Sequence, residues 1–566
     1  MRTTPQNLVD TYTGNGWWGE ETLGSLFAAA VAEAADRPAL ADPPNREVLV
    51  GGAAMRYTFG ELDVAATELA TALFAAGLRQ GDEILVQLPN CTEIVLVYLA
   101  AAKLGLIVSP IAIQYGPFEI EHVTKVIEPK AYLAFERFND DDYGTRHAGI
   151  LNEGCRALLF ENGAADSLRL SQDVESAQAA CAEYVAGLVQ DANDIFTICW
   201  TSGTTGTPKG VPRSHNHWLS STLASEDSVR LVPEDIMLNP FPFINMAAIG
   251  GFLYYWLKLR NLMVLHHPFD PMVFLSQLQN EKINYTIAPP AVLTRLLIDK
   301  EQIQQAFDLS SVHTIGSGSA PLSPSMIRGF EEEFGIKVTN LFGSNEGAAL
   351  VGNSIDIPDP EDRAVFFPRF GRPEHTWDNR LAAMMRTRLT DLDSGEEITE
   401  PGTPGELCIS GPTVFDGYYK SDQDNVNVFT ADGFFRTGDV FQIAGPHNEF
   451  YQFVGRCKDI IVRGGVNISP EELDAVLQDH PDILECAVCG YPDEIMGERI
   501  ALFAVPNEGA TVELDSVTQF LAHKGVAKIK WPEKLVAIEA LPRNALNKIL
   551  RNTLVDQLQQ LPGNEP

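Results

Sequence analysis

The segment Thr201–Gly210, TSGTTGTPKG, combines glycines, hydroxyl side chains and a single lysine in one short stretch. Glycines let a backbone approach an anion closely, hydroxyls donate hydrogen bonds, and Lys209 supplies a positive charge. This pattern predicts a loop that binds phosphate groups, whereas GTTG alone would fit a solvated turn equally well. The loop differs from the nucleotide-hydrolase pattern GxxxxGK[ST], because Pro208 precedes the lysine and disfavours the start of a helix there.

Five later segments follow this loop along the rest of the chain. They are SGSAPL (Ser317–Leu322), LFGSNEG (Leu341–Gly347), FFRTGD (Phe434–Asp439), GRCKDIIVRGG (Gly455–Gly465) and PRNALNK (Pro542–Lys548). In this order after TSGTTGTPKG they resemble the motifs of the adenylate-forming superfamily. That superfamily contains acyl-CoA synthetases, aryl-acid activating enzymes, nonribosomal adenylation domains and firefly luciferase, and the chain is most similar to an acyl- or aryl-CoA ligase.

The resemblance implies an ATP site. The phosphates are expected at Thr201, Ser202, Gly203, Thr204, Thr205, Gly206 and Lys209. The AMP part is expected at Ser319, Ala320, Pro321, Phe342, Gly343, Ser344, Asn345, Asp439 and Arg456, where Asp439 accepts hydrogen bonds from both ribose hydroxyls. Phe342 replaces a tyrosine that borders adenine, and Asn345 replaces a threonine that touches the α-phosphate. An aromatic face and an amide donor can serve in their place.

The resemblance assigns catalytic roles to Lys548, Glu346 and Lys209. Glu346 is expected to hold Mg²⁺ through the ATP phosphates, and a carboxylate suits this hard cation because it prefers oxygen ligands. Lys548 matches the terminal lysine of the family, which stabilises negative charge on the α-phosphate during attack. The family has glycine before that lysine and this chain has Asn547. Asparagine tolerates left-handed backbone conformations, so we expect the loop to keep its shape.

The family joins two half-reactions by rotating its C-terminal domain about a hinge residue, which maps to Lys458. The resemblance implies that rotation withdraws Lys548 and brings Gly464 and Gly465 beside the incoming thiol, where glycines permit close approach. The motifs say least about which carboxylic acid is the substrate. Asn245 stands where the family pocket usually has histidine, so Phe243, Asn245 and Met246 are candidate pocket residues. A purely structural helix start at this point is an equal alternative.

These motifs predict an ATP-dependent carboxylic acid:CoA ligase. The acid and ATP would give acyl-AMP and pyrophosphate, and the thiol of coenzyme A would then give acyl-CoA and AMP. The alternative is an aryl-acid AMP ligase that loads the phosphopantetheine thiol of a carrier protein. No carrier-like segment precedes Pro566, so the thiol acceptor is expected to be separate. A nucleotide-binding regulator without catalysis is a third class. Lys209, Glu346, Asp439 and Lys548 argue against it, whereas Asn345 and Asn547 keep it open.

The composition limits the kinds of binding partner that we expect. The formal net charge of −35 disfavours binding to nucleic acid or anionic lipid, and it means that ATP or coenzyme A needs local cations. The acidic excess is typical of solubility, with adaptation to high salt as the alternative. No segment has the length of a membrane span, and the N-terminus lacks the apolar region of a secretory signal. We therefore expect a cytoplasmic protein with free thiols, and the sequence leaves its oligomeric state open.

The elements that must position these residues are typical of an α/β fold. Expected helices are Glu21–Ala35, Thr58–Ala76, Asn90–Ala102, Pro470–Leu477 and Val512–Leu521, and expected strands are Glu83–Leu88, Leu106–Ile111, Phe196–Trp200, Asn261–His267, Ile283–Ile287, Val312–Ile315, Lys337–Phe342 and Glu485–Cys489. In open α/β sheets ligands bind at the carboxyl ends of strands, so the loops at 201–210, 316–322 and 342–347 are predicted to share one site.

The length predicts more than one domain. Residues 1–457 are expected to form a large domain of layered α/β subdomains, with a β-rich lobe at about 385–455. Residues 458–566 are expected to form a small, mobile α+β domain. Two further patterns favour structural roles. Cys486 and Cys489 form a CxxC on an expected strand, where this spacing points the thiols to opposite faces. His215 and His217 lack nearby partners with metal-ligand spacing.

Overall fold

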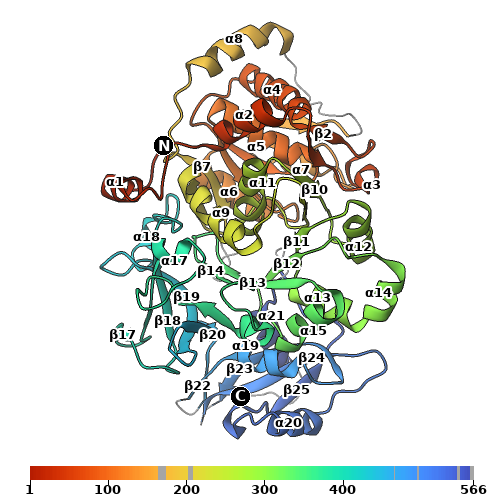
Figure 1. Cartoon of the computed structure of the whole chain (residues 1–566), viewed down its shortest axis with the longest axis vertical. Coiled ribbons are helices and arrows are strands. Elements are labelled where there is room, and N and C mark those ends of the chain that lie inside the picture. Colours follow the sequence, from red (N-terminus) through yellow and green to blue (C-terminus); the bar gives the residue numbers. More distant parts are fainter. Residues whose placement is uncertain are drawn as a thin grey trace.

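The computed structural model describes residues 1–139, 141–162, 174–201, 208–463, 466–493, 496–544 and 548–560. The chain has the expected mixed α/β architecture with several sheets and a small C-terminal domain. The helical first part of the chain, the β-rich lobe and the C-terminal elements, shown in blue, occupy separate regions of the molecule (Figure 1). Among the described residues, no helix combines the length and the apolar character needed to cross a membrane.

The first sheet carries two of the predicted ligand loops at its strand ends. Its strand order is β14-β13-β12-β11-β9-β10-β1-β2, with parallel pairing from β13 to β1 and antiparallel edges. The strands are β1 (Pro38–Ala41), β2 (Arg56–Thr58), β9 (Ile236–Asn239), β10 (Leu262–Leu265), β11 (Tyr285–Ile287), β12 (Thr314–Gly318), β13 (Lys337–Gly343) and β14 (Ala349–Gly352).

The second sheet carries the phosphate-loop candidate. Its order is β6-β5-β3-β4-β7-β8, parallel except for the antiparallel pair β7–β8. The strands are β3 (Glu83–Gln87), β4 (Ile107–Pro110), β5 (Ala131–Phe135), β6 (Arg156–Phe160), β7 (Ile195–Trp200) and β8 (Gly210–Ser214). The largest apolar cluster contains side chains of both sheets, such as Leu265 and Val86, and so it joins them through a common core.

Helices fill and cover the sheets. Helix α4 begins where the sequence predicted, because Thr58 caps it and Glu61 returns the hydrogen bond in a capping box. Helix α5 is buried on nearly all sides, which explains its continuous apolar sequence. The helices of the first two thirds of the chain are α1 (Gln6–Gly14), α2 (Leu23–Ala34), α3 (Arg46–Val50), α4 (Phe59–Ala75), α5 (Thr92–Leu104), α6 (Pro117–Ile127), α7 (Tyr143–Ala148), α8 (Val174–Gly187), α9 (His215–Val229), α10 (Met246–Ala248), the π-helical turn η1 (Ile249–Leu253), α11 (Tyr254–Leu259), α12 (Pro271–Asn280), α13 (Pro290–Ile298), α14 (Lys300–Ala306), α15 (Pro324–Phe334), α16 (Pro360–Val365) and α17 (Leu381–Met384).

The β-rich lobe is an antiparallel sheet of order β15-β20-β19-β18-β16-β17. Its elements are β15 (Phe366–Pro368), β16 (Arg386–Thr390), β17 (Glu397–Ile398), β18 (Gly405–Ser410), α18 (Asp422–Asn425), β19 (Phe435–Ala444) and β20 (Phe450–Arg456). The sheet therefore begins before the expected position near residue 385, because β15 pairs with β20 at its edge. Strands β19 and β20 bring Asp439 and Arg456 side by side.

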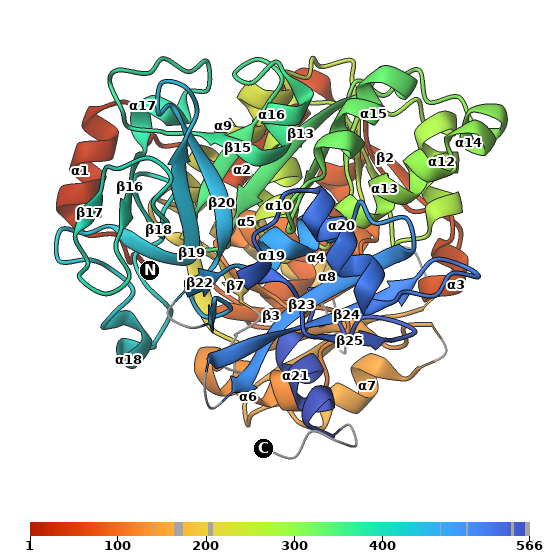
Figure 2. The ribbon, with the colours of Figure 1, turned by 90° about the horizontal axis from the view of Figure 1, so that it is seen from below.

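The C-terminal elements form their own sheet, with the order β22-β21-β24-β23 and with β25 paired to β24. They are β21 (Ile461–Arg463), β22 (Val466–Ile468), α19 (Pro470–Leu477), β23 (Ile483–Asp493), β24 (Gly497–Pro506), α20 (Leu514–His523), the 3₁₀ turn η2 (Lys528–Lys530), β25 (Lys534–Ala537) and α21 (Arg551–Gln560). Seen from below, these elements lie across the rest of the chain (Figure 2). Cys486 and Cys489 are free, buried thiols that pack into different apolar clusters, as opposite strand faces require.

Candidate active site

The phosphate-loop candidate connects two antiparallel strands at the edge of the second sheet. Trp200 at the end of β7 pairs with Gly210 at the start of β8, and the Thr201 N–H donates to the Lys209 carbonyl at 3.0 Å. Both ends of the loop are thus fixed by backbone hydrogen bonds. The predicted phosphate-binding residues between them, Ser202, Gly203, Thr204, Thr205 and Gly206, lie outside the described residues.

Lys209 and Glu346 both contact the side chain of Tyr418. The Lys209 Nζ lies 2.8 Å from Asp424 Oδ1 and 4.9 Å from the ring centroid of Tyr418. The Tyr418 hydroxyl donates to Glu346 Oε1 at 2.9 Å, and the Glu346 side chain is buried. The cationic and anionic residues assigned to the ATP phosphates therefore share one wall, although they lie far apart in the sequence.

The other two predicted loops lie together at the ends of adjacent strands. Gly318, the last residue of β12, is packed so closely on β13 that an added Cβ would stand 2.1 Å from the Leu341 carbonyl oxygen. The next residue, Ser319, is exposed and has a φ of +72°, a strained value for a residue with a side chain. Phe342 packs edge-on against Phe441 of β19, with 5.0 Å between ring centroids.

Asn345 ties these loops to the phosphate loop and to the pocket candidate. Its Oδ1 accepts the Met246 N–H at 2.9 Å, and its Nδ2 donates to the Trp200 carbonyl at 3.4 Å. The Trp200 carbonyl stands at the end of β7, before the phosphate loop, and the Met246 N–H stands at the start of α10. An amide can bridge them because it carries both a donor and an acceptor, which a threonine hydroxyl supplies on a single atom. The strand that leads into the phosphate loop therefore contacts the loop at 342–347, and the loop at 316–322 follows the adjacent strand of the first sheet.

Arg213 is a supporting residue that sequence reasoning missed. It is fully buried, and it donates to the Asn345 carbonyl at 3.1 Å, the His217 carbonyl at 3.1 Å and the Ser221 Oγ at 2.6 Å. Burial lowers the pKa of the Arg213 guanidinium to about 10. Arg213 lies in the segment Val211–Trp218, VPRSHNHW. The sequence of this segment does not distinguish a buried arginine from an exposed one. His217 is also buried, which lowers its pKa, and it lies 3.7 Å from Asp416.

Asp439 and Arg456 form an ion pair across β19 and β20, with 3.2 Å between Nε and Oδ1. The Asp439 side chain is nearly buried, and this burial raises its pKa to about 6, against the lowering effect of Arg456 and Lys548. A carboxylate that is paired with Arg456 can still accept hydrogen bonds from hydroxyl donors, because its two oxygens have several lone pairs. The geometry suits the ribose-binding role that the resemblance implies.

Lys548 reaches the same site from the C-terminal domain. Its loop is closed by two hydrogen bonds, from the Lys548 N–H to Asn544 Oδ1 at 3.0 Å and from the Asn544 N–H to the Lys548 carbonyl at 2.9 Å. Burial and the neighbouring Arg456 lower the pKa of the Lys548 ammonium, while Asp439 and Glu346 act in the opposite direction. The lysine thus interacts with both acidic residues assigned to the nucleotide.

The three candidate residues of the acid pocket have different surroundings in the structure. Phe243 is fully buried in the largest apolar cluster, so its side chain belongs to the core. Asn245 caps α10, because its side chain accepts the Ala248 N–H at 3.2 Å, which is the structural helix start considered as the alternative. Met246 is half-buried next to Asn345. Lys458 is exposed in the turn after β20, and Gly464 and Gly465 lie outside the described residues.

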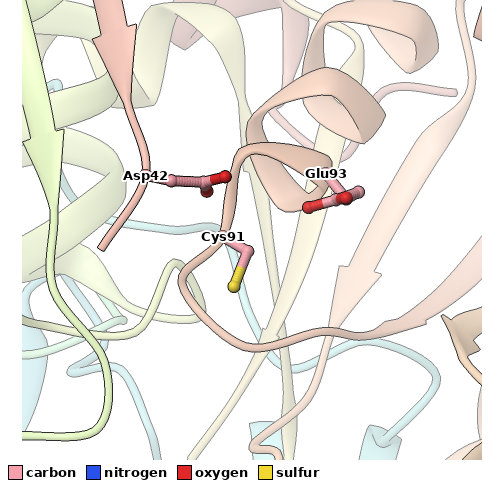
Figure 3. A group of neighbouring side chains, drawn as sticks. All are labelled: Asp42, Cys91 and Glu93. Carbon is pink, nitrogen blue, oxygen red and sulfur yellow. The ribbon is translucent and has the colours of Figure 1, made fainter. Parts of the chain in front are cut away.

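A separate buried cluster brings together metal-ligating side chains. Among the described residues, Asp42 after β1, Cys91 and Glu93 at the start of α5 lie within ligand distance of one another (Figure 3). The Arg46 guanidinium already uses both carboxylates, donating to Asp42 Oδ2 at 3.0 Å and to Glu93 Oε2 at 2.8 Å. Burial raises the pKa of the Cys91 thiol well above its usual range, which disfavours the thiolate that binds metals. Asp42, Arg46 and Glu93 therefore form a buried ion triad, which fixes the start of α5.

Comparison with known families identifies the family of the chain. The family described as "AMP-binding enzyme" matches residues 27–419, and "AMP-binding enzyme C-terminal domain" matches residues 472–548. The first match covers most of the chain, and so the chain belongs to the family of AMP-binding enzymes. It is an adenylate-forming ligase by family, and ATP is the nucleotide that this family and its ATP-bound neighbours support.

Individual relatives span nearly the whole chain. Triostin synthetase I from Streptomyces triostinicus is 30% identical over 559 residues, covering 97% of each protein. Medium-chain fatty-acid–CoA ligase from Escherichia coli is 29% identical, covering 97% of this chain and 93% of its own. 2,3-Dihydroxybenzoate-AMP ligase from Bacillus subtilis is 26% identical, covering 98% and 97%. The crystal structure of ATP-bound MatB from Rhodopseudomonas palustris is 26% identical, with a TM-score of 0.76 over 95% of this chain and 99% of that one.

Proposed function

We propose that the protein is an ATP-dependent carboxylic acid:CoA ligase that works through an acyl-adenylate. The observation that carries this proposal is the charge interaction of Lys548 with Asp439 and Glu346, because the lysine comes from the C-terminal domain and the carboxylates from the rest of the chain. A lysine that interacts with these two carboxylates fits the needs of acid activation by ATP. A binding protein without catalysis would not require the lysine there.

In the first half-reaction, an oxygen of the substrate carboxylate attacks the α-phosphorus of ATP, and pyrophosphate leaves. Lys548 stabilises the negative charge that develops on the α-phosphate, and Lys209 holds the departing phosphates. Asp439 accepts the ribose hydroxyls and so fixes the nucleotide. Glu346 fits a magnesium ligand, since it is a buried carboxylate beside the phosphate lysine. Mg²⁺ bound there would neutralise phosphate charge.

In the second half-reaction, the thiol of coenzyme A attacks the acyl carbon and loses its proton, and AMP leaves with the bond electrons. A thiol of pKa about 8.5 is partly ionised at neutral pH, so no strong base is required. We propose that the C-terminal domain, beginning at Lys458, rotates between the steps. Rotation would withdraw Lys548 and place Gly464 and Gly465 along the path of the thiol.

The thiol acceptor has a second candidate, a carrier protein. The fatty-acid–CoA ligase relative favours coenzyme A, while the similar 2,3-dihydroxybenzoate-AMP ligase favours an aryl-acid AMP ligase that passes its product to a carrier-bound thiol. Coenzyme A is our first choice because of the higher identity to the CoA ligase. The protein's net charge of −35 means that either acceptor requires local cations, and Arg456, Lys458 and Lys548 lie at the site.

The deciding experiment is pyrophosphate release over a panel of aliphatic, cyclic and aromatic carboxylic acids, with and without coenzyme A. We expect release with at least one acid, and a thioester in the presence of coenzyme A. Adenylate without thioester would favour the carrier-protein alternative. No release with any acid would contradict acid activation and leave the regulator hypothesis standing.

The hinge assignment predicts a selective defect in Lys458→Pro. In the turn after β20 the Asp459 and Ile460 N–H groups donate to the Arg456 carbonyl, and proline at position 458 would stiffen this turn. We expect pyrophosphate release to remain within about threefold of wild type and thioester formation to fall by at least about tenfold, a free-energy difference of ~1.4 kcal/mol. Lys458→Ala, which keeps the backbone free, is the control. Equal losses in both half-reactions would refute the hinge at this residue.

A further inference from the structure

The segment Gly417–Asn425, GYYKSDQDN, meets the phosphate loop although no motif assigned it to the site. Asn425 clamps the backbone of Tyr418, because its Oδ1 accepts the Tyr418 N–H at 2.7 Å and its Nδ2 donates to the Tyr418 carbonyl at 2.9 Å. Gly417 makes this close approach possible, with a φ of +132° and a Cβ position only 3.1 Å from Asn425 Oδ1. The segment is therefore a compact support for Tyr418.

Tyr418 connects this segment to both phosphate-site residues. Its ring lies under the Lys209 ammonium, and its hydroxyl donates to Glu346. The ring also packs edge-on against Phe415, with 5.0 Å between centroids, which fixes its orientation. Contacts on Tyr418 thus belong to the nucleotide site and not to a remote part of the surface.

Asp424 is the residue of the segment that touches Lys209 directly. Its Oδ1 lies 2.8 Å from the Lys209 Nζ, and its Oδ2 accepts the Ser421 hydroxyl at 2.5 Å. The Lys209 hydrogen bond lowers the pKa of the Asp424 carboxyl further below neutral, so the group is ionised under ordinary conditions. The pair is partly exposed, with 27% of the Lys209 side chain and 36% of the Asp424 side chain accessible.

We propose that Asp424 is a positioning residue that holds Lys209 in the nucleotide-free enzyme as a stand-in for phosphate, and that the triphosphate of ATP competes with it for this lysine. The inference rests on the proposed ATP-dependent function. The carboxylate keeps the long lysine side chain ordered and close to Glu346. When the β- and γ-phosphates bind, Lys209 exchanges one anion for another, and Asp424 is left beside negative charge.

The competition has a defined direction. Replacing Asp424 by asparagine preserves the shape and the acceptor for Ser421, but it removes the charge that favours the free state. Partly exposed ion pairs are weak, so Asp424→Asn is expected to tighten ATP binding by no more than about two- to fivefold. The gain is expected to shrink in 0.5 M salt, because salt screens the charges that compete. AMP lacks the β- and γ-phosphates, so its affinity is expected to change by less than about 1.5-fold.

The test is calorimetric titration of the full-length protein with ATP and with AMP, in the presence of magnesium and without an acid substrate. Asp422→Asn is the matched control, since it removes the same charge from an exposed position on the same short helix. Asp424→Glu is the conservative variant, and we expect it to restore wild-type ATP affinity. A structural role for Asp424 would change ATP and AMP affinity together, whereas competition for Lys209 changes ATP affinity alone.

The outcomes separate this inference from the proposed function. ATP tightening confined to Asp424→Asn supports the inference. Equal tightening in Asp422→Asn, weaker ATP binding, or parallel changes for ATP and AMP would overturn it while the wild-type protein still binds both nucleotides. A wild-type protein that binds neither nucleotide would overturn the proposed function, and the inference with it.

Discussion

Lys548→Ala is expected to lower the rate of acyl-adenylate formation by about 10²- to 10³-fold, which corresponds to ~2.7–4 kcal/mol of lost transition-state stabilisation. The lysine interacts with Glu346 and Asp439, and in the proposed mechanism its ammonium stabilises the charge that develops on the α-phosphate. The measurement is single-turnover pyrophosphate release with an acid that the wild-type enzyme accepts. Thioester formation from a supplied acyl-adenylate is expected to stay within about threefold of wild type, because the proposed domain rotation withdraws Lys548 for that step.

Lys524→Ala is the matched control, since Lys524 belongs to the same domain but pairs with Asp479 at the surface. The pH dependence gives a second readout. Burial lowers the pKa of Lys548, and the charged form is the active one. Adenylation by the wild-type enzyme should therefore fall as pH rises through a value below that of an ordinary lysine, and the residual rate of Lys548→Ala should lack this limb. Equal losses in both half-reactions would instead indicate a structural role.

Arg46→Met is expected to destabilise the protein by about 3–5 kcal/mol, because it leaves two buried carboxylates without their cation. Asp42 and Glu93 are both buried and both hydrogen-bonded to Arg46, and Asp42 also accepts the Thr92 N–H at 2.8 Å at the start of α5. The measurement is urea unfolding followed by circular dichroism. Arg56→Met is the control, since the Arg56–Glu281 pair is largely exposed and its loss should cost less than about 1 kcal/mol.

The sign of the pH effect identifies the cause of this loss. Burial raises the pKa of Asp42 and of Glu93 in the wild-type protein, and removing Arg46 takes away the charge that opposes this rise. A carboxyl group whose pKa is higher in the folded state binds protons on folding, so its contribution to stability is lost as pH rises. Arg46→Met should therefore lose more stability at pH 8 than at pH 5. A loss no larger than that of Arg56→Met would contradict the triad.

Much of the fold followed from local patterns in the sequence. The capping pair Thr58 and Glu61 located the start of α4. The apolar residues Phe196–Trp200 located β7, which precedes the phosphate loop. These signals lie within a few residues of the elements they define. Strand β15 was missed because it exists only through pairing with β20, far along the chain. Strand β23 extends beyond the predicted Glu485–Cys489, because its long antiparallel partner β24 continues the ladder.

The site, like the fold, could be predicted from the sequence only in part. The loops were predicted by their composition and by family resemblance. The loops at 316–322 and 342–347 follow adjacent strands of one sheet, so their proximity could be expected, whereas the phosphate loop belongs to the other sheet. The contacts between them were not predictable, since Arg213 and Asn345 act through burial and through partners distant in sequence. The ion triad was also missed. Asp42 and Arg46 have the spacing of an ordinary surface pair, and nothing local shows that Glu93 joins them in the core.

The raised pKa of Asp439 predicts that nucleotide binding at this residue is coupled to the release of a proton. The carboxyl has a pKa of about 6 without nucleotide, so near that pH about half of the molecules carry a proton there. Ribose hydroxyls that donate to the ionised form lower the pKa, and the complex must then release that proton to the solvent. Adenosine carries the same ribose hydroxyls but no phosphate that titrates near pH 6. The heat observed on adding adenosine near pH 6 should therefore change with the ionisation enthalpy of the buffer, and this dependence should vanish at pH 8.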